Sequence, residues 1–123
     1  MEDRKLIVVG VDGSEDGLRA VKYGASFAAE IDGELLLVHA VDDAMLAGAW
    51  GVVYDPEVLQ NAGVSANEAA AAKARETGLG EERIRTEVVL GSPGGVLGRL
   101  SEVADLIVVG RRSVSGLERM FVG

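Results

Sequence analysis

Residues 5–16 establish the class of fold: Lys5-Leu-Ile-Val-Val-Gly-Val-Asp-Gly-Ser-Glu-Asp16. A continuous apolar run follows the polar start, which predicts a buried strand over residues 5–11. Ser14 is a suitable N-cap residue, and Glu15 and Asp16 suit the positive end of the dipole of a following helix. A buried strand that leads directly into a helix is typical of a parallel α/β sheet.

The same alternation of short apolar runs and longer helical segments continues along the chain. We expect further strands over residues 34–41, 84–90 and 106–109, and helices over residues 15–31 and 56–77 and from Pro93 onward. The order β-α-β-α-β-α-β implies right-handed crossovers and a parallel sheet. The predicted fold is a doubly wound, three-layer α/β sandwich with a flavodoxin-like strand order and at least four parallel strands.

Helical spacing also predicts which side chains are buried. On the first and third predicted helices, the inward-facing residues are expected to be Leu18, Val21, Ala25 and Ala28, and Val96, Leu97, Leu100 and Val103. Residues 43–55 show no clear period and are interpreted as a long loop packed on the domain, with Trp50 and Tyr54 filling the core beneath it. His39 is interpreted as a hydrogen-bonded core residue, because no second histidine or cysteine accompanies it.

The composition limits the classes of function. The chain has 123 residues, which fit one domain, and 48% of them are hydrophobic while only 4% are aromatic, so the core is aliphatic. A formal net charge of −8 disfavours nucleic acid or an anionic membrane as the main partner. The lack of cysteine excludes disulfides and thiolate chemistry. No signal peptide or run of about 20 apolar residues is evident, so the cytoplasm is the expected compartment.

In an open parallel sheet, ligands bind at the carboxyl ends of the strands where the strand order reverses, here between the first and fourth predicted strands. The first strand leads into Asp12, which is well placed to accept hydrogen bonds from a ligand. The simpler interpretation is an aspartate that accepts from amides of its own turn, and taken alone this role is favoured. Glu15 and Asp16 would repel a phosphate, so an anionic ligand would present its neutral end here.

The fourth predicted strand leads into a second polar loop, which begins Gly110-Arg-Arg-Ser113. Backbone amides, a hydroxyl and the guanidinium groups of Arg111 and Arg112 are suitable phosphate ligands. The alternative is a solvated basic loop that balances nearby acids. Combined with the acidic turn opposite, the pattern favours a ligand whose base and ribose lie toward Asp12 and whose phosphates lie toward these arginines.

The segments Ile7-Val-Val-Gly-Val-Asp-Gly-Ser14 and Asp105-Leu-Ile-Val-Val-Gly110, with Gly91-Ser-Pro93, resemble the universal stress protein family over essentially the whole chain. Its ATP-binding members carry G-x-x-G, nine residues and G-[ST] after the fourth strand. Here Gly110-Arg-Arg-Ser113 is followed by nine residues and Gly123. The resemblance implies an adenine nucleotide, ATP or AMP, with or without Mg²⁺. With the donor-rich loop, it suggests a site made of Val11, Asp12, Ala40, Val109, Gly110, Arg112, Ser113 and Gly123.

Within this resemblance, each position has an implied role. Asp12 binds the adenine or ribose end with Val11 beside it, and Ala40 packs on the base. Val109 and Gly110 flank the ribose. Ser113 and Gly123 bind the phosphates, and the chemistry of the loop adds Arg112 to them.

The chain departs from the family pattern at two places. Ser113 stands where the family has the second glycine, which adds a Cβ near the phosphates but also a hydroxyl donor. The serine or threonine expected after Gly123 is missing, as are the last helix and strand, so residues 1–123 are interpreted as one C-terminally incomplete domain. In the family the last strand usually forms the dimer contact, which implies a homodimer for the complete protein.

Three functions are compatible with these features. The first is a regulatory module of the stress response that binds an adenine nucleotide and acts through ligand-dependent conformation and contacts. The second is a nucleotide-independent interaction protein of the same fold, favoured by Ser113 and the missing tail. A slow ATPase is the weakest, because no general base or pair of metal-binding carboxylates is evident. We therefore do not expect an enzyme.

Overall fold

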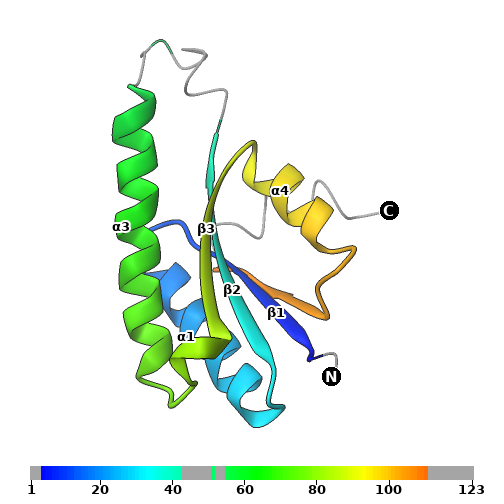
Figure 1. Ribbon diagram of the computed structural model, residues 1–123. Coiled ribbons are helices and arrows are strands. Elements are labelled where there is room, and N and C mark those ends of the chain that lie inside the picture. The colour runs from blue at the N-terminus through cyan, green and yellow to red at the C-terminus, as the bar shows by residue number, and fades with distance from the viewer. Residues whose placement is uncertain (1–3, 43–50, 52–54, 111–123) are drawn as a thin grey trace.

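The computed structural model describes residues 4–42, 51 and 55–110, and Figure 1 shows a twisted sheet with helices on both faces. The strands are β1 (Leu6–Gly10), β2 (Glu34–Val41), β3 (Ile84–Leu90) and β4 (Leu106–Val108). They pair in parallel in the order β3-β2-β1-β4. The predicted doubly wound α/β fold is confirmed, and the strand order reverses between β1 and β4.

The connections begin where the sequence signals place them. In the described residues they contain α1 (Glu15–Glu30), α3 (Pro56–Arg75), the 3₁₀ turn η1 (Glu81–Arg83) and α4 (Pro93–Leu100). The side chains of Ser14, Asp55 and Ser92 each accept a hydrogen bond, at 2.8–3.1 Å, from an amide in the first turn of the helix that follows. These caps pair amides that the helix itself leaves unpaired. None of the helices in the described part of the chain is both long and apolar enough to cross a membrane.

Two apolar clusters hold the three layers together, one on each face of the sheet. Figure 1 shows α1 and α3 on one face and α4 on the other. Successive strand residues point to opposite faces, so Ile7, Val9, Leu35 and Leu37 pack beneath α1 and α3, whereas Val8, Leu36 and Val38 pack against Val96 and Leu97 of α4. The strands are apolar on both faces because both faces are covered.

The predicted helix faces are largely confirmed. Val21, Ala25 and Ala28 are buried in the cluster beneath α1 and α3, and Val96 and Leu97 in the cluster beneath α4. Leu18 and Leu100 are partly buried and pack against these clusters. The prediction for Val103 is wrong, because its side chain is 66% exposed. α4 ends at Leu100, so helical spacing no longer applies at Val103. Trp50, Tyr54 and most of the predicted loop over residues 43–55 lie outside the described residues.

Candidate functional site

A small cavity lies at the carboxyl ends of β1 and β2, beside the first turns of α4. Its volume is about 110 Å³. It is lined by Gly10, Val11, Asp12, Val38, His39, Ala40, Pro93, Val96 and Leu97. A mainly apolar wall with a few polar groups is typical of a small-molecule site. Whole drug-sized ligands occupy roughly 300–1,000 Å³, so this cavity would hold one part of a larger ligand.

Gly10 allows β1, β4 and α4 to approach one another at this cavity. A Cβ atom on Gly10 would lie 3.3 Å from Cδ1 of Leu97 and 3.4 Å from Cγ1 of Val109. A larger residue at position 10 would press against Leu97, which lines the cavity. The same distances place Val109 beside Gly10, so this predicted site residue lies next to the cavity without lining it.

Asp12 is held by its own turn through one carboxylate oxygen. Its Oδ1 accepts hydrogen bonds from the amide of Ser14 at 2.9 Å and from the hydroxyl of Ser14 at 2.6 Å. This is the structural role that the simpler interpretation of the sequence assigned to Asp12. Its Oδ2 has no hydrogen-bond partner among the described residues, and the side chain is exposed. One acceptor therefore remains available at the mouth of the cavity.

The end of β4 lies against the first turn of α1. A Cβ atom on Gly110 would lie 2.9 Å from the carbonyl carbon of Asp16 and 3.0 Å from the amide nitrogen of Gly17, and Gly110 is buried. Only glycine permits this approach without moving the backbone of one segment. The contact brings the start of the predicted phosphate loop next to the acidic first turn that contains Glu15 and Asp16.

His39 is a cavity residue that the sequence did not reveal. Its Nδ1 lies 2.8 Å from the carbonyl oxygen of Val11, and the side chain is half-buried. A carbonyl oxygen can only accept, so Nδ1 donates this hydrogen bond. The predicted hydrogen bond is therefore present, and the ring lies on the α3 side of the sheet, because a Cβ atom on Gly63 would come within 2.8 Å of Cδ2 of His39. The available signal was the position of His39 near the carboxyl end of a strand.

The predicted site residues fall into three groups. Val11, Asp12 and Ala40 line the cavity, and Val109 and Gly110 lie beside it. Arg111, Arg112, Ser113 and Gly123 lie outside the described residues. The wall residues that sequence reasoning missed are Gly10, Val38, His39, Pro93, Val96 and Leu97. Most of these carry no polar group, so nothing in their chemistry distinguished them from ordinary core residues.

Comparison with known proteins identifies the family. The model of the universal stress protein family matches residues 4–123. The chain belongs to this family. It is 32% identical over 126 residues to a universal stress protein of Methanocaldococcus jannaschii, an alignment that covers 97% of this chain and 71% of the relative.

Solved structures of universal stress proteins share the fold. A family member from Burkholderia pseudomallei is 26% identical with a TM-score of 0.71, and the match covers 95% of this chain and 89% of that chain. A universal stress protein solved in complex with cAMP is 26% identical with a TM-score of 0.59, covering 86% of this chain and 71% of that chain. The family assignment made from the sequence motifs is confirmed.

Proposed function

We propose that this chain is an adenine-nucleotide-binding module of the stress response, with ATP or AMP as its ligand and Mg²⁺ accompanying ATP. The observation that carries this proposal is the apolar cavity at the carboxyl ends of β1 and β2, lined in part by Asp12, whose Oδ2 has no hydrogen-bond partner among the described residues. A purine base suits an apolar cleft, and a ribose hydroxyl suits a carboxylate acceptor beside it. The related universal stress protein solved with cAMP, itself an adenine nucleotide, supports the ligand class.

The electrostatics of the cavity support one orientation of the nucleotide. The base packs on Ala40 and Val11, and Oδ2 of Asp12 accepts from the ribose, with Val109 and Gly110 flanking it. The phosphates extend away from the carboxylates of the first turn of α1, because like charges at short range repel. In this proposal Arg112, Ser113 and Gly123 bind the phosphates.

The proposed module acts by binding and not by turnover, in the cytoplasm and as a homodimer. A ligand shifts a conformational equilibrium only as far as its affinity differs between the two states. In this proposal the phosphates favour one arrangement of the segment after Gly110. The nucleotide thereby changes which surfaces the protein presents to a partner.

The direct test is calorimetric titration of MgATP and of AMP into the wild-type chain and the Asp12→Ala variant. A hydrogen bond to a charged group contributes about 1.5–3 kcal/mol, so we expect Asp12→Ala to weaken binding about tenfold or more. The matched control is Ser14→Ala, which removes the hydroxyl that Asp12 and Gly17 share but leaves the carboxylate. This variant should keep most of the affinity.

The outcomes separate the two leading functions. Equal losses in Asp12→Ala and Ser14→Ala would assign the effect to the turn and remove Asp12 from the binding site. No binding of either nucleotide by the wild-type chain, together with no nucleotide retained through purification, would favour the nucleotide-independent interaction protein.

A further inference from the structure

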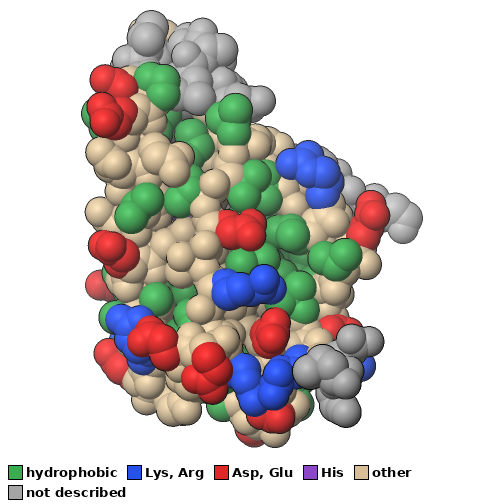
Figure 2. All heavy atoms as spheres, viewed as in Figure 1, with side chains coloured by type: hydrophobic (Ala, Val, Ile, Leu, Met, Phe, Trp, Pro, Cys, Tyr) green, Lys and Arg blue, Asp and Glu red, His purple; other side chains and the backbone are tan. Residues whose placement is uncertain are grey.

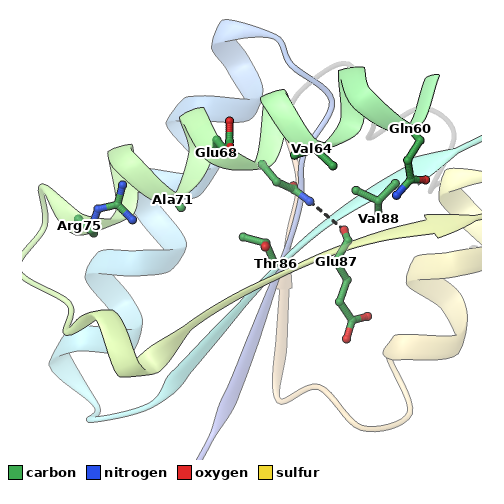
Figure 3. A pocket seen from close by; sticks show the side chains of 9 residues that line it. Gln60, Val64, Glu68, Ala71, Arg75, Thr86, Glu87 and Val88 are labelled. Atoms are coloured by element: carbon green, nitrogen blue, oxygen red, sulfur yellow. Dashed lines mark hydrogen bonds between the residues drawn. The ribbon is translucent and has the colours of Figure 1, made fainter. Parts of the chain in front are cut away.

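The outer edge of β3 is a second region with features of a binding surface, well separated from the cavity at the strand ends. β3 is an edge strand of the described sheet. An open groove of about 390 Å³ runs between it and α3. Figure 3 shows Thr86 and Val88 of β3 pointing toward α3, whereas the side chain of Glu87 points away from it. Val64 and Ala71 of α3 form part of the opposite wall.

The outer edge of β3 carries backbone groups that have no partner strand in the described part of the chain. Beyond its last residue, the amide of Gly91 donates to the carbonyl of Val41 at 2.8 Å, as expected for parallel pairing with β2. Alternate residues of a parallel strand face the same neighbour, so Glu87 directs its N–H and C=O toward β2. Thr86 and Val88 direct their N–H and C=O groups to the outer side of β3, away from β2. Such an edge is a template for an additional strand.

The groove also contains a buried acceptor without a donor. The side chain of Asn67 is only 3% exposed, and its Nδ2 donates to the carbonyl oxygen of Glu87 at 2.9 Å, as the dashed line in Figure 3 marks. Its Oδ1 is buried and has no hydrogen-bond partner among the described residues. Buried polar atoms are nearly always paired in native proteins.

The charges of β3 suit pairing with a second copy of the same strand. Arg85 and Glu87 flank Thr86, and both are exposed. Figure 2 shows basic and acidic side chains close together near the middle of the view, where Figure 1 places β3. Arg85 makes one long ion pair, 3.8 Å to Glu34, and Glu87 makes none with a described residue. Both charges are therefore available to a partner.

The symmetry of this pattern selects one register. In an antiparallel pair with its two-fold axis at Thr86, Arg85 of each copy lies opposite Glu87 of the other, which stabilises the pair. An axis at Glu87 or at Arg85 would instead oppose two like charges. Thr86 faces outward, as residues that exchange hydrogen bonds across an antiparallel pair must.

We propose that the β3 edge binds the β3 edge of a second copy of this chain, antiparallel and with the two-fold axis at Thr86. The pairing joins two sheets into one. The groove beside α3 receives the side chains that the partner strand directs to that face. This interface is independent of nucleotide binding, and it lies on the opposite edge of the described sheet from β4.

The chain has no cysteine, so single cysteines report this register directly. Opposed residues that exchange hydrogen bonds have Cα atoms about 5.5 Å apart, within the range of a disulfide. Mild oxidation of the Thr86→Cys variant should therefore give a disulfide-linked dimer on a non-reducing gel. The matched control is Val88→Cys on the same face, whose two copies would lie four residues apart along the strand, about 14 Å. It should stay monomeric on the gel.

Charge substitutions test the same interface in the reduced protein. Arg85→Glu would oppose two carboxylates at each end of the pair, so we expect dimerisation in sedimentation to weaken about tenfold. The double variant Arg85→Glu with Glu87→Arg exchanges the two charges and should restore it. Absence of the Thr86→Cys cross-link, equal cross-linking by Val88→Cys, or a dimer that ignores the charge substitutions would overturn the proposal. A dimer that forms through the β4 edge of the sheet would not respond to the charge substitutions in β3.

Discussion

The two faces of the sheet are packed to different extents. In the described residues, thirteen buried residues form the cluster beneath α1 and α3, whereas five form the cluster beneath α4. On the first face α1 lies so near the sheet that a Cβ on Gly24 would come within 2.6 Å of Cγ2 of Val9. On the second face the cavity opens between the strand ends and α4. We infer that the first face supplies most of the stability, and that the second leaves room for a ligand.

The greatest loss of stability is expected for Leu37→Ala beneath α1 and α3. Leu37 is fully buried in β2, an interior strand of the described sheet, where the surrounding elements cannot collapse into the space left. A cost of about 3–5 kcal/mol in the free energy of unfolding is expected, toward the upper part of the range for such truncations. Urea denaturation measures it. Leu90→Ala is the control, because that leucine is 59% exposed and its truncation should cost less than about 1 kcal/mol.

A smaller loss is expected for the equivalent substitution on the other face, Leu97→Ala in α4. Leu97 is 4% exposed, but it borders the cavity, and α4 is a short helix that can adjust. We expect a cost of about 2–3 kcal/mol, together with altered nucleotide affinity because the cavity is enlarged. If Leu97→Ala proved more costly than Leu37→Ala in the same urea experiment, the inferred difference between the faces would be wrong.

Gly24→Ala examines the close approach of α1 directly. Overpacking against Val9 costs about 1–3 kcal/mol, and the better helix propensity of alanine offsets about 1 kcal/mol of it. The net expectation is a destabilisation of about 1 kcal/mol in thermal or urea unfolding. Ser26→Ala, at an exposed position of the same helix, is the control and should be neutral or slightly stabilising. A stabilised Gly24→Ala variant would show that α1 can move away from the sheet.

The smallest effect is expected at the rim, for Asp32→Asn just after α1. The hydrogen bond and positive charge of Arg83, whose Nη1 lies 2.7 Å from Oδ1 of Asp32, hold the pKa of this carboxyl below its ordinary value of 3.8. Asp32 has a φ of 57°, a conformation that asparagine also tolerates. The substitution therefore removes the charge and keeps the backbone.

The lowered pKa gives this prediction a direction with pH. Because the folded-state pKa is depressed, the ion pair contributes its full stability above pH 3.8 and loses it as the pH falls through the lower folded value. At pH 7 the wild-type chain should be slightly more stable to unfolding than the Asp32→Asn variant. This difference in stability should disappear in acid. Urea unfolding at several pH values measures this. A difference that does not change with pH would show that the charge is not its cause.

Much of the fold could be predicted because its signals are local. Apolar runs, the caps at Ser14 and Ser92 and the proline at the start of α3 depend on residues close together in the chain. The prediction that Val103 is buried was wrong because α4 ends at Leu100, one turn before the apolar pattern in the sequence ends. The candidate site could be predicted only at its strand ends, because its apolar wall looks like ordinary core.

The residue pattern of this chain predicts its strands and helices, the parallel sheet that their alternation implies, and the position of Asp12 just after β1. These properties follow from the spacing of neighbouring residues. The cavity beside α4, the bond from His39 to Val11 and the buried acceptor of Asn67 emerge only on folding. His39 is 28 residues from Val11, and Asn67 is 20 residues from Glu87, so no local pattern encodes which of them meet. Packing of distant segments sets those contacts, and with them the room available for a ligand.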